Sequence, residues 1–314
     1  MQKSLLVCGT GALATLFAAR LSAAGWAVTM LGTWSEALET LNRHGAQVEG
    51  EAPAPVVAVK DLAACAPVPL ALVLVKSWQT GRLARQLADC LAPDGVAITL
   101  QNGLGNDALL AQTLGRERVS AGVTTLGAFL SAPGRVCWAG DGPIWLEADA
   151  RLDRLATVLR QAGFNVERVE DIRPRQWGKL VINAAINPLT ALLRVPNGVL
   201  LTDPLARDLM GKLARETAAV AAALGIALPF LSPEQAVEDV ARRTAANQSS
   251  MLRDVLRGAP TEIEAINGAV VRAGRAQGAD VRLNRLVRDL VRARRSLSSA
   301  ELMGMVRLTL QEHH

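Results

Sequence analysis

The first part of the chain alternates short apolar runs with helical segments. Residues 4–8 form an apolar run that predicts a buried strand, and residues 12–24 follow as a helix rich in alanine and leucine. Gly25 ends that helix, and residues 26–31 predict a second strand. A strand, a helix and a second strand in this order are typical of a βαβ unit with parallel strands.

Further apolar runs extend this sheet along the chain. They predict strands at residues 56–59, 70–75 and 96–100, and residues 119–126 extend the domain. Residues 136–146 carry glycines and a proline between short apolar pieces, a pattern typical of antiparallel edge strands. We therefore expect an α/β domain with a doubly wound, mostly parallel sheet.

The second half of the chain shows helical periodicity and no clear strand. Helices are predicted at residues 175–194, 203–225, 233–256, 261–277, 282–296 and 298–312. We expect an all-helical second domain and place the boundary near residues 168–173, which divides the chain into 1–168 and 169–314. The cleft between two such domains is the expected place for a ligand.

The turn between the first predicted strand and helix has the spacing of a phosphate-binding loop. Gly9 allows a tight turn, Gly11 lets the backbone approach a pyrophosphate at the helix N-terminus, and Ala14 takes the third position as a tolerated variant. At the end of a first strand, this motif predicts a dinucleotide site rather than a plain turn. The residues expected to line the site are Gly9, Thr10, Gly11, Ala12, Leu13 and Ala14.

The end of the second predicted strand bears on the choice between NADP and NAD. A carboxylate there would bind the ribose hydroxyls of NAD, but the sequence M-L-G-T-W has none. It has no arginine for a 2′-phosphate either. Thr33 and Ser35 offer hydroxyl groups, and Arg43 could reach in from the following helix. We favour NADP as the cofactor, and NAD is not excluded.

Two polar residues follow buried strands. Lys76 comes directly after A-L-V-L-V, and Asn102 follows the strand predicted at 96–100. Open α/β sheets bind ligands at the carboxyl ends of their strands, so both residues are candidates for the site. Ordinary loop chemistry is the alternative, above all for Asn102, because Asn-Gly favours turns.

A stripe of polar residues lies on an otherwise apolar helix. Lys179, Asn183 and Asn187 are four residues apart and therefore share one helical face. Burying an unpaired amide costs about 1–3 kcal/mol, so these side chains need partners. A structural hydrogen-bond network would supply them, but a polar ligand in a cleft explains the stripe better.

A second carboxylate-bearing segment, T-E-I-E-A-I-N-G, lies in the helix predicted at 261–277. At 100° per residue, Glu262 falls beside the apolar face and Glu264 falls away from it, so we expect Glu262 to point inward. Just before this segment, Ser249 and Ser250 precede an apolar helix. A helix N-cap is the alternative role for either serine.

The composition removes several mechanisms. The chain has no tyrosine, which excludes a reductase with a Tyr–Lys acid. Of its three histidines, His44 lies in a polar stretch and His313 and His314 end the chain, so neither a His–carboxylate dehydrogenase nor a histidine-ligated zinc site is expected. A carbonyl reductase must then use a lysine or a carboxylic acid as its proton donor. The chain has only five lysines against 29 arginines.

The net charge of +5 is carried by the second half of the chain, largely by arginines in the helix at 282–296. Leucines and valines interleave with them at helical spacing, which indicates an amphipathic helix with a solvated arginine face. No aromatic residue lies in this segment to stack on bases, so no nucleic-acid partner is expected. The four cysteines form no C-x-x-C pair, Cys8 is expected to be buried, and no metal site is predicted. The apolar runs are too short for a membrane span and the N-terminus lacks signal-peptide features, so a cytoplasmic protein is expected.

Motifs spread over nearly the whole chain resemble the ketopantoate reductase (2-dehydropantoate 2-reductase) family. They are the G-x-G-A-L turn, V-K-S-W-Q, Q-N-G-L-G, K-L-V-I-N-A-A-I-N-P-L-T-A-L, V-P-N-G, S-S-M-L-R-D and T-E-I-E-A-I-N-G. The resemblance implies a Rossmann-type domain followed by a helical domain like that of 6-phosphogluconate dehydrogenase. It also implies NADPH-dependent reduction of 2-dehydropantoate to (R)-pantoate, a step toward pantothenate and coenzyme A.

The resemblance also implies roles for individual residues. Lys179 would be the catalytic acid, and Glu262 would help to position it and the substrate. The substrate carboxylate and hydroxyl would be held by Asn183, Asn187, Asn197 and Ser250. Asn102 would lie between cofactor and substrate, with Lys76 beside the cofactor. Burial should lower the pKa of Lys179, while Glu262 opposes that shift.

One position departs from the family pattern. Members often carry an arginine where Thr33 stands, which bears on the cofactor preference. Two alternatives are kept: a reductase of similar fold that acts on another branched 2-oxo acid or an imine-derived substrate, and a non-catalytic NADP-binding regulatory protein. The regulatory protein would not need Lys179, Asn183 and Glu262, which are all present. A homodimer is kept as the candidate assembly, although the sequence does not decide it.

Overall fold

The computed structural model describes residues 4–62 and 67–311, so His313 and His314 lie outside it. Its contacts divide the chain into two compact units. The first contains the chain up to Gln101 and Gly105–Ile172. The second contains the chain from Arg173 onward together with the loop Asn102–Leu104.

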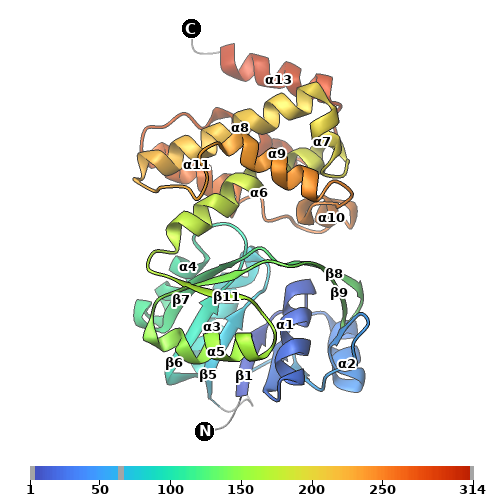
Figure 1. The fold of residues 1–314 in the computed structure, drawn as a ribbon, viewed down its shortest axis with the longest axis vertical. Helices are drawn as coiled ribbons and strands as arrows, with labels where there is room; N and C mark the ends of the chain where they lie inside the picture. The colour runs from blue at the N-terminus through green and yellow to red at the C-terminus, as the bar shows by residue number, and fades with distance from the viewer. Residues whose placement is uncertain (1–3, 63–66, 312–314) are drawn as a thin grey trace. The chain divides into compact units, whose positions relative to one another are not determined.

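Within the described residues, the first unit contains an eight-stranded sheet in the order β11-β10-β7-β6-β5-β1-β2-β4 (Figure 1). Its strands are β1 (Ser4–Cys8), β2 (Ala27–Leu31), β4 (Val57–Val59), β5 (Val68–Val73), β6 (Leu91–Thr99), β7 (Val119–Thr124), β10 (Ile144–Glu147) and β11 (Val166–Val169). Neighbouring strands are parallel except for β7 and β10. The predicted doubly wound, mostly parallel sheet is confirmed, with strand ends shifted by a few residues.

Helices cover both faces of this sheet. They are α1 (Ala12–Ala23), α2 (Ser35–His44), α3 (Thr80–Cys90), α4 (Asn106–Leu114) and α5 (Asp153–Gln161). Along β1, Leu5 and Val7 pack into a core with α1 and α5, whereas Leu6 and Cys8 pack into a second core with α3 and α4. Burial on both faces explains why β1 is a continuous apolar run. Cys8 is buried as expected, and burial raises the pKa of its thiol.

A smaller sheet of the first unit has the order β3-β9-β8. Its strands are β3 (Gln47–Val48), β8 (Gly127–Ala132) and β9 (Arg135–Gly140). The antiparallel pairing predicted over residues 136–146 is confirmed, because β9 pairs with β8 and β10 pairs with β7 in this way, but the predicted edge position is wrong. Strand β9 pairs with a strand on either side, and β10 lies between β7 and β11. The edge is taken by β11, whose sequence V-E-R-V carries two charged residues and was not recognised as a strand.

The second unit is helical throughout the part that the structure describes. Its helices are α6 (Arg173–Leu193), α7 (Val199–Thr202), α8 (Pro204–Ala223), α9 (Pro233–Arg243), α10 (Ser250–Leu256), α11 (Asn267–Ala276), α12 (Arg282–Arg292) and α13 (Ser299–Gln311). Helix α6 packs against α8, α9, α10 and α12 and supplies much of the apolar core. Over residues 4–62 and 67–311, no helix has the length and apolar character needed to cross a bilayer.

Two predicted helices of this unit are wrong in extent. The helix predicted at 233–256 is divided into α9, which ends at Arg243, and α10, which the Ser249 hydroxyl caps by accepting the Leu252 N–H at 3.0 Å. The helix predicted at 261–277 begins only at Asn267. Ile266 has φ −96° and ψ −91°, outside the helical region, so the preceding residues form turns instead.

Helix α12 confirms the predicted amphipathic pattern. Leu283, Val287 and Leu290 are buried, whereas Arg285 and Arg292 are exposed to solvent. The arginine-rich segment is therefore a solvated helix face over an apolar core.

Candidate active site

The turn between β1 and α1 is shaped by Gly9. Its φ of +131° is unfavourable for residues with a side chain, and a Cβ there would lie 3.2 Å from the Leu74 carbonyl carbon and 3.3 Å from the Ala14 Cβ. The Gly9 N–H donates to the Leu31 carbonyl at 2.7 Å. Glycine is therefore required for the tight turn, and Ala14 fits beneath it.

The N-terminus of α1 has the properties of an anion-binding site. Gly11 is the N-cap and provides no side-chain cap, and the first turn of the helix contains no acidic residue. A Cβ at Gly11 would meet no atom within 4 Å, so the space beside this residue at the start of α1 is open. Unpaired N–H groups and the helix dipole together favour a phosphate at this position.

The residues that directly follow β2, Gly32 to Trp34, include no carboxylate, and the next one along the chain is Glu36 in the first turn of α2. Thr33 is exposed, and a Cβ on the preceding Gly32 would collide with the Thr10 side chain at 2.4 Å. Arg43 lies in the last turn of α2 and its guanidinium is 3.9 Å from the Glu39 carboxylate. Arg43 thus lies near the opposite end of α2 from Thr33, about 12 Å along the helix axis from Ser35.

The loop after β5 holds Lys76, whose Nζ lies 5.9 Å from the centroid of the Trp78 ring. Gln101, two residues after the end of β6, fixes this loop. Its Nε2 donates to the Val75 carbonyl at 2.8 Å and to the Thr80 hydroxyl at 2.9 Å. Our reading of the sequence missed Gln101, although it directly precedes the asparagine of Q-N-G-L-G.

The loop Asn102–Leu104 packs against the segment that carries Glu262. Asn102 donates from Nδ2 to Glu262 Oε2 at 3.3 Å, and the Leu104 N–H donates to the Ala265 carbonyl at 2.9 Å. Gly103 has φ +80°, and a Cβ there would lie 2.2 Å from the Ala265 oxygen. Backbone meets backbone at this point, so only glycine fits.

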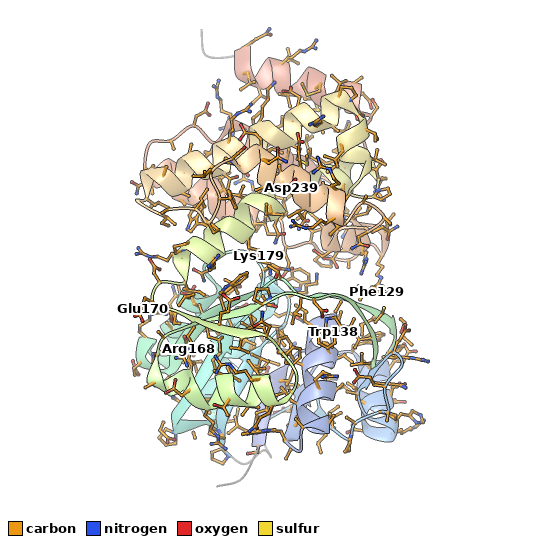
Figure 2. All side chains as sticks on the ribbon, viewed as in Figure 1. Phe129, Trp138, Arg168, Glu170, Lys179 and Asp239 are labelled. Atoms are coloured by element: carbon orange, nitrogen blue, oxygen red, sulfur yellow. The ribbon has the colours of Figure 1, made fainter. Side chains whose placement is uncertain are left out.

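Helix α6 places Lys179, Asn183 and Asn187 on one face, as predicted from their spacing. Figure 2 shows Lys179 on this helix. Lys179 and Asn183 are half-buried, and Asn187 is 7% exposed. Within the described residues, neither asparagine side chain has a hydrogen-bond partner. Neither side chain has a buried amide atom without a partner, so both amides keep contact with solvent and are accessible to a polar ligand.

The Lys179 ammonium is perturbed in the way that a proton donor requires. Burial lowers the pKa of Lys179 from 10.5 to about 8, and the Glu262 carboxylate partly opposes this shift. Both expected causes are present, and burial is the larger. At neutral pH the group is charged but releases its proton far more readily than a surface lysine.

Glu262 points inward although the helix from which this was inferred is absent. It is 6% exposed, whereas Glu264 is exposed and lies 3.7 Å from Arg272 and 3.3 Å from Arg292. The turn at 261–266 points the two carboxylates to opposite sides, as a helix would also do. The inference about Glu262 therefore holds for a different structural reason.

The other expected substrate residues lie in the loops around α10. Asn197 is 7% exposed, and its Nδ2 donates to the Thr244 hydroxyl at 2.8 Å, while its Oδ1 is buried without a partner. Ser249 is buried and lies 2.7 Å from the Thr190 hydroxyl. Ser250 is exposed at the first position of α10. The N-cap role weighed for both serines thus belongs to Ser249.

A buried polar network beside α6 was not found in the sequence. Asn267 and Asn284 are fully buried, and Asn284 donates from Nδ2 to Glu216 Oε1 at 2.8 Å. Burial raises the pKa of the Glu216 carboxyl, and the hydrogen bonds from Asn284 act against this. The one local signal was the asparagine of I-N-G, five residues after Glu262.

The second unit therefore brings Lys179, Asn183 and Asn187 onto one helix and holds Asn102 against Glu262. An ammonium with a pKa near 8 can stabilise negative charge on a substrate oxygen and then deliver a proton to it. Across the described ranges, no three His, Cys, Asp or Glu side chains gather into a group that could hold a metal ion.

Comparison with known proteins places the chain in a family. The model "Ketopantoate reductase PanE/ApbA" matches residues 5–151, and "Ketopantoate reductase PanE/ApbA C terminal" matches residues 171–295. A 2-dehydropantoate 2-reductase of Archaeoglobus fulgidus is 39% identical over 295 residues, which cover 91% of this chain and 96% of the relative.

Solved structures agree with this assignment. A PanE/ApbA family ketopantoate reductase from Ralstonia eutropha JMP134 has a TM-score of 0.86 at 28% identity, covering 96% of this chain and 99% of that one. A D-mandelate dehydrogenase solved with NADH and anilino(oxo)acetate also has a TM-score of 0.86, at 25% identity, with 95% and 99% covered. The fold, the motifs and the relatives agree, and the chain belongs to the ketopantoate reductase PanE/ApbA family of oxidoreductases.

Proposed function

We propose that the protein catalyses the NADPH-dependent reduction of 2-dehydropantoate to (R)-pantoate, with Lys179 as the general acid. The observation that carries this proposal is the lowered pKa of Lys179 beside Glu262, on the same helical face as Asn183 and Asn187. A relative 39% identical to the chain bears the name 2-dehydropantoate 2-reductase, which supports the substrate.

The turn from Gly9 to Ala14 fits the nucleotide. The backbone N–H groups at the start of α1 would hold the pyrophosphate, and the open space at Gly11 would admit it. Lys76 and Thr33 would contribute to the same site. When bound, the reduced nicotinamide nucleotide supplies a hydride for the carbonyl carbon of the substrate.

Lys179 would act on the carbonyl oxygen. As the carbon gains a hydride, negative charge develops on this oxygen, and the ammonium stabilises the charge and transfers a proton to it. The product is an alcohol, and the neutral lysine amine regains its proton from water. Glu262, held by Asn102, keeps the ammonium in place and favours its charged form.

The substrate's polar groups would bind along α6 and the neighbouring loops. In the part of the chain that the structure describes, the Asn183 and Asn187 amides bond to no other group, so they can donate to a carboxylate and accept from a hydroxyl. Ser250 is exposed and accessible to a ligand. Asn197 would take part through its second amide oxygen only after a local rearrangement, because that atom is enclosed.

NADP is proposed over NAD because the end of β2 lacks a carboxylate for the ribose hydroxyls. The related D-mandelate dehydrogenase was solved with NADH, so a preference for NAD is the alternative. That structure also holds anilino(oxo)acetate, a 2-oxo acid derivative. A second candidate function is therefore the reduction of another branched 2-oxo acid.

Steady-state kinetics test substrate and cofactor together. We would measure kcat/KM for 2-dehydropantoate and for a panel of branched and aromatic 2-oxo acids, each with NADPH and with NADH. The proposal expects the highest kcat/KM for 2-dehydropantoate with NADPH. No turnover of 2-dehydropantoate with either nucleotide rules the proposal out, and a higher value for another 2-oxo acid favours the second candidate.

A further inference from the structure

Helix α6 contains a proline at position 188. In an α-helix the carbonyl of residue 184 accepts its hydrogen bond from the N–H of residue 188, and proline has no N–H. The Ala184 carbonyl therefore lacks its donor within the helix. Because Ala184 is fully buried, water cannot replace that donor, and an unpaired buried carbonyl is unfavourable.

Asn267 supplies the missing donor. Its Nδ2 lies 2.9 Å from the Ala184 oxygen, and its side chain is completely buried. Asn267 is the first residue of α11 and lies directly after the turn that carries Glu262. One side chain thus links the helix that bears Lys179 to the segment that bears Glu262.

The direction of this hydrogen bond is set by its neighbours. The Glu216 carboxylate accepts from the Asn284 Nδ2, so the Asn284 oxygen must face Asn267, at 2.8 Å from its Nδ2. Asn267 therefore turns its NH₂ group toward both acceptors, Asn284 Oδ1 and the Ala184 oxygen. A side chain that cannot donate two hydrogen bonds does not fit this position.

We propose that Asn267 is a positioning residue, which replaces the helix hydrogen bond lost at Pro188 and thereby fixes Lys179 relative to Glu262. The inference rests on the proposed function only in naming Lys179 as the acid. Without Asn267, α6 is free to shift at the Pro188 break, and the ammonium and carboxylate separate.

The test uses Pro188→Ala as the specific rescue. Asn267→Ala removes the donor to Ala184, and Pro188→Ala restores one from the backbone of α6 itself. We expect Asn267→Ala to lower kcat by about 10- to 100-fold, since small displacements of a reacting group cost this much, with KM for NADPH unchanged. The single and the double variant both leave the Asn284 oxygen without its donor, and they differ only in whether the Ala184 carbonyl has one. The double variant should therefore regain most of the lost kcat.

A second readout does not depend on turnover. The chain has five lysines, so ¹³C-labelled lysine allows the titration of Lys179 to be followed by NMR and assigned with Lys179→Arg. Because Glu262 raises the pKa of Lys179, their separation should shift the pKa below about 8 in Asn267→Ala. Adding Pro188→Ala should return it to the parent value.

Asn42→Ala is the matched control. Asn42 also bridges two buried backbone groups, with bonds of 2.8 Å to the carbonyl and the N–H of Ala58, but it lies in the first unit. It should lower stability without moving the Lys179 titration. A shift as large as that of Asn267→Ala would mark the effect as nonspecific and overturn the proposal.

The remaining outcomes separate this inference from the proposed function. If the parent does not turn over 2-dehydropantoate, the proposed function fails, and the NMR titration still tests the positioning of Lys179. An unchanged titration in Asn267→Ala, or no rescue by Pro188→Ala, overturns the positioning role. If Asn267→Ala does not fold, the double variant decides: a folded protein with the parent titration supports the role, and an unfolded one overturns it.

Discussion

At the scale of single residues, Lys179 joins two properties that oppose each other. In the proposed role of general acid, Lys179 must be charged to stabilise a developing alkoxide, yet it must release its proton easily. Burial favours release, Glu262 favours the charge, and the resulting pKa of about 8 lies near neutral pH. An arginine would hold its proton permanently and could not take this role.

Replacement of Lys179 should remove the acid without disturbing the nucleotide site. We expect Lys179→Ala to lower kcat by about 10²- to 10⁴-fold, the usual contribution of a general acid, with little change in the Kd for NADPH. Kinetics and nucleotide titration measure the two effects separately. Lys212→Ala is the control for loss of a lysine, since Lys212 lies on α8 and pairs with Asp208 at 2.7 Å. Equal activity of Lys179→Ala and the parent removes Lys179 from this role.

Gly11 allows nucleotide binding to be separated from folding. Its φ of −80° suits any residue, and a Cβ there would touch no atom within 4 Å. We expect Gly11→Ala to change the free energy of unfolding by less than about 1 kcal/mol while weakening NADPH binding at least about tenfold. Gly304→Ala, also in open space, is the control. Unaltered NADPH affinity in Gly11→Ala would place the nucleotide elsewhere.

At the scale of elements, the loop Asn102–Leu104 owes its place to Gly103. In Gly103→Ala the new methyl group would collide with the Ala265 oxygen, and the φ of +80° adds about 1–2 kcal/mol of strain. The Asn102–Glu262 hydrogen bond should break, with a loss of both kcat and stability. Gly278→Ala is the control, because Gly278 has φ +66° but a Cβ there would meet no atom within 4 Å, so this variant has the backbone strain without the collision. Identical losses in the two variants, by kinetics and denaturation, would contradict the docking argument.

Elements with one apolar face could be predicted from the sequence. The arginine-flanked stripe of α12 and the continuous apolar run of β1, which is buried on both faces, are local patterns, and both were recognised. The turn at 261–266 was not, because its sequence has helical spacing and the break depends on the backbone of Ile266. The stripe on α6 was found because its three residues share one helix.

Contacts between distant parts of the chain could not be predicted in this way. Asn267 and Ala184 are 83 residues apart, and no local sequence pattern indicates that the Asn267 amide donates to the Ala184 carbonyl. Ser249 and Ser250 are equivalent in the sequence, and only the packing of Thr190 decides which one caps α10. Family resemblance supplied roles for Asn197 and Ser250 that the residues alone do not suggest.

At the scale of the whole molecule, Lys179 links stability to pH. Below pH 8 it is protonated in the folded and the unfolded chain, and the burial penalty is fully present. Between pH 8 and 10.5 only the unfolded chain keeps the proton, so this group makes the folded state more stable as pH rises, by up to about 3 kcal/mol.

Denaturation at pH 7.5 and pH 10 tests this linkage. Other groups also titrate in this range, so the quantity of interest is the difference between the parent and Lys179→Met. We expect the parent to gain stability relative to the variant over this interval. A constant difference at both pH values would mean that the pKa of Lys179 is the same in the folded and unfolded chain.

The division of the chain also limits how it can be cut. The loop Asn102–Leu104 lies in the middle of the first unit's sequence but packs with the second. A fragment from Arg173 onward therefore lacks the Asn102 amide that binds Glu262 and the Leu104 N–H that binds Ala265. The helical unit is complete only in the intact chain.

The proline in α6 has a consequence for how such a chain can change over generations. While Pro188 is present, a loss of Asn267 leaves a buried carbonyl without a donor. Once position 188 carries an N–H, the Ala184 carbonyl no longer needs the hydrogen bond from Asn267, and Asn267 can be replaced. The order of the two replacements therefore matters. If Pro188 is replaced first, the Ala184 carbonyl keeps a donor throughout. If Asn267 is replaced first, the intermediate protein has a buried carbonyl without a donor. Relatives that lack the asparagine should also lack the proline.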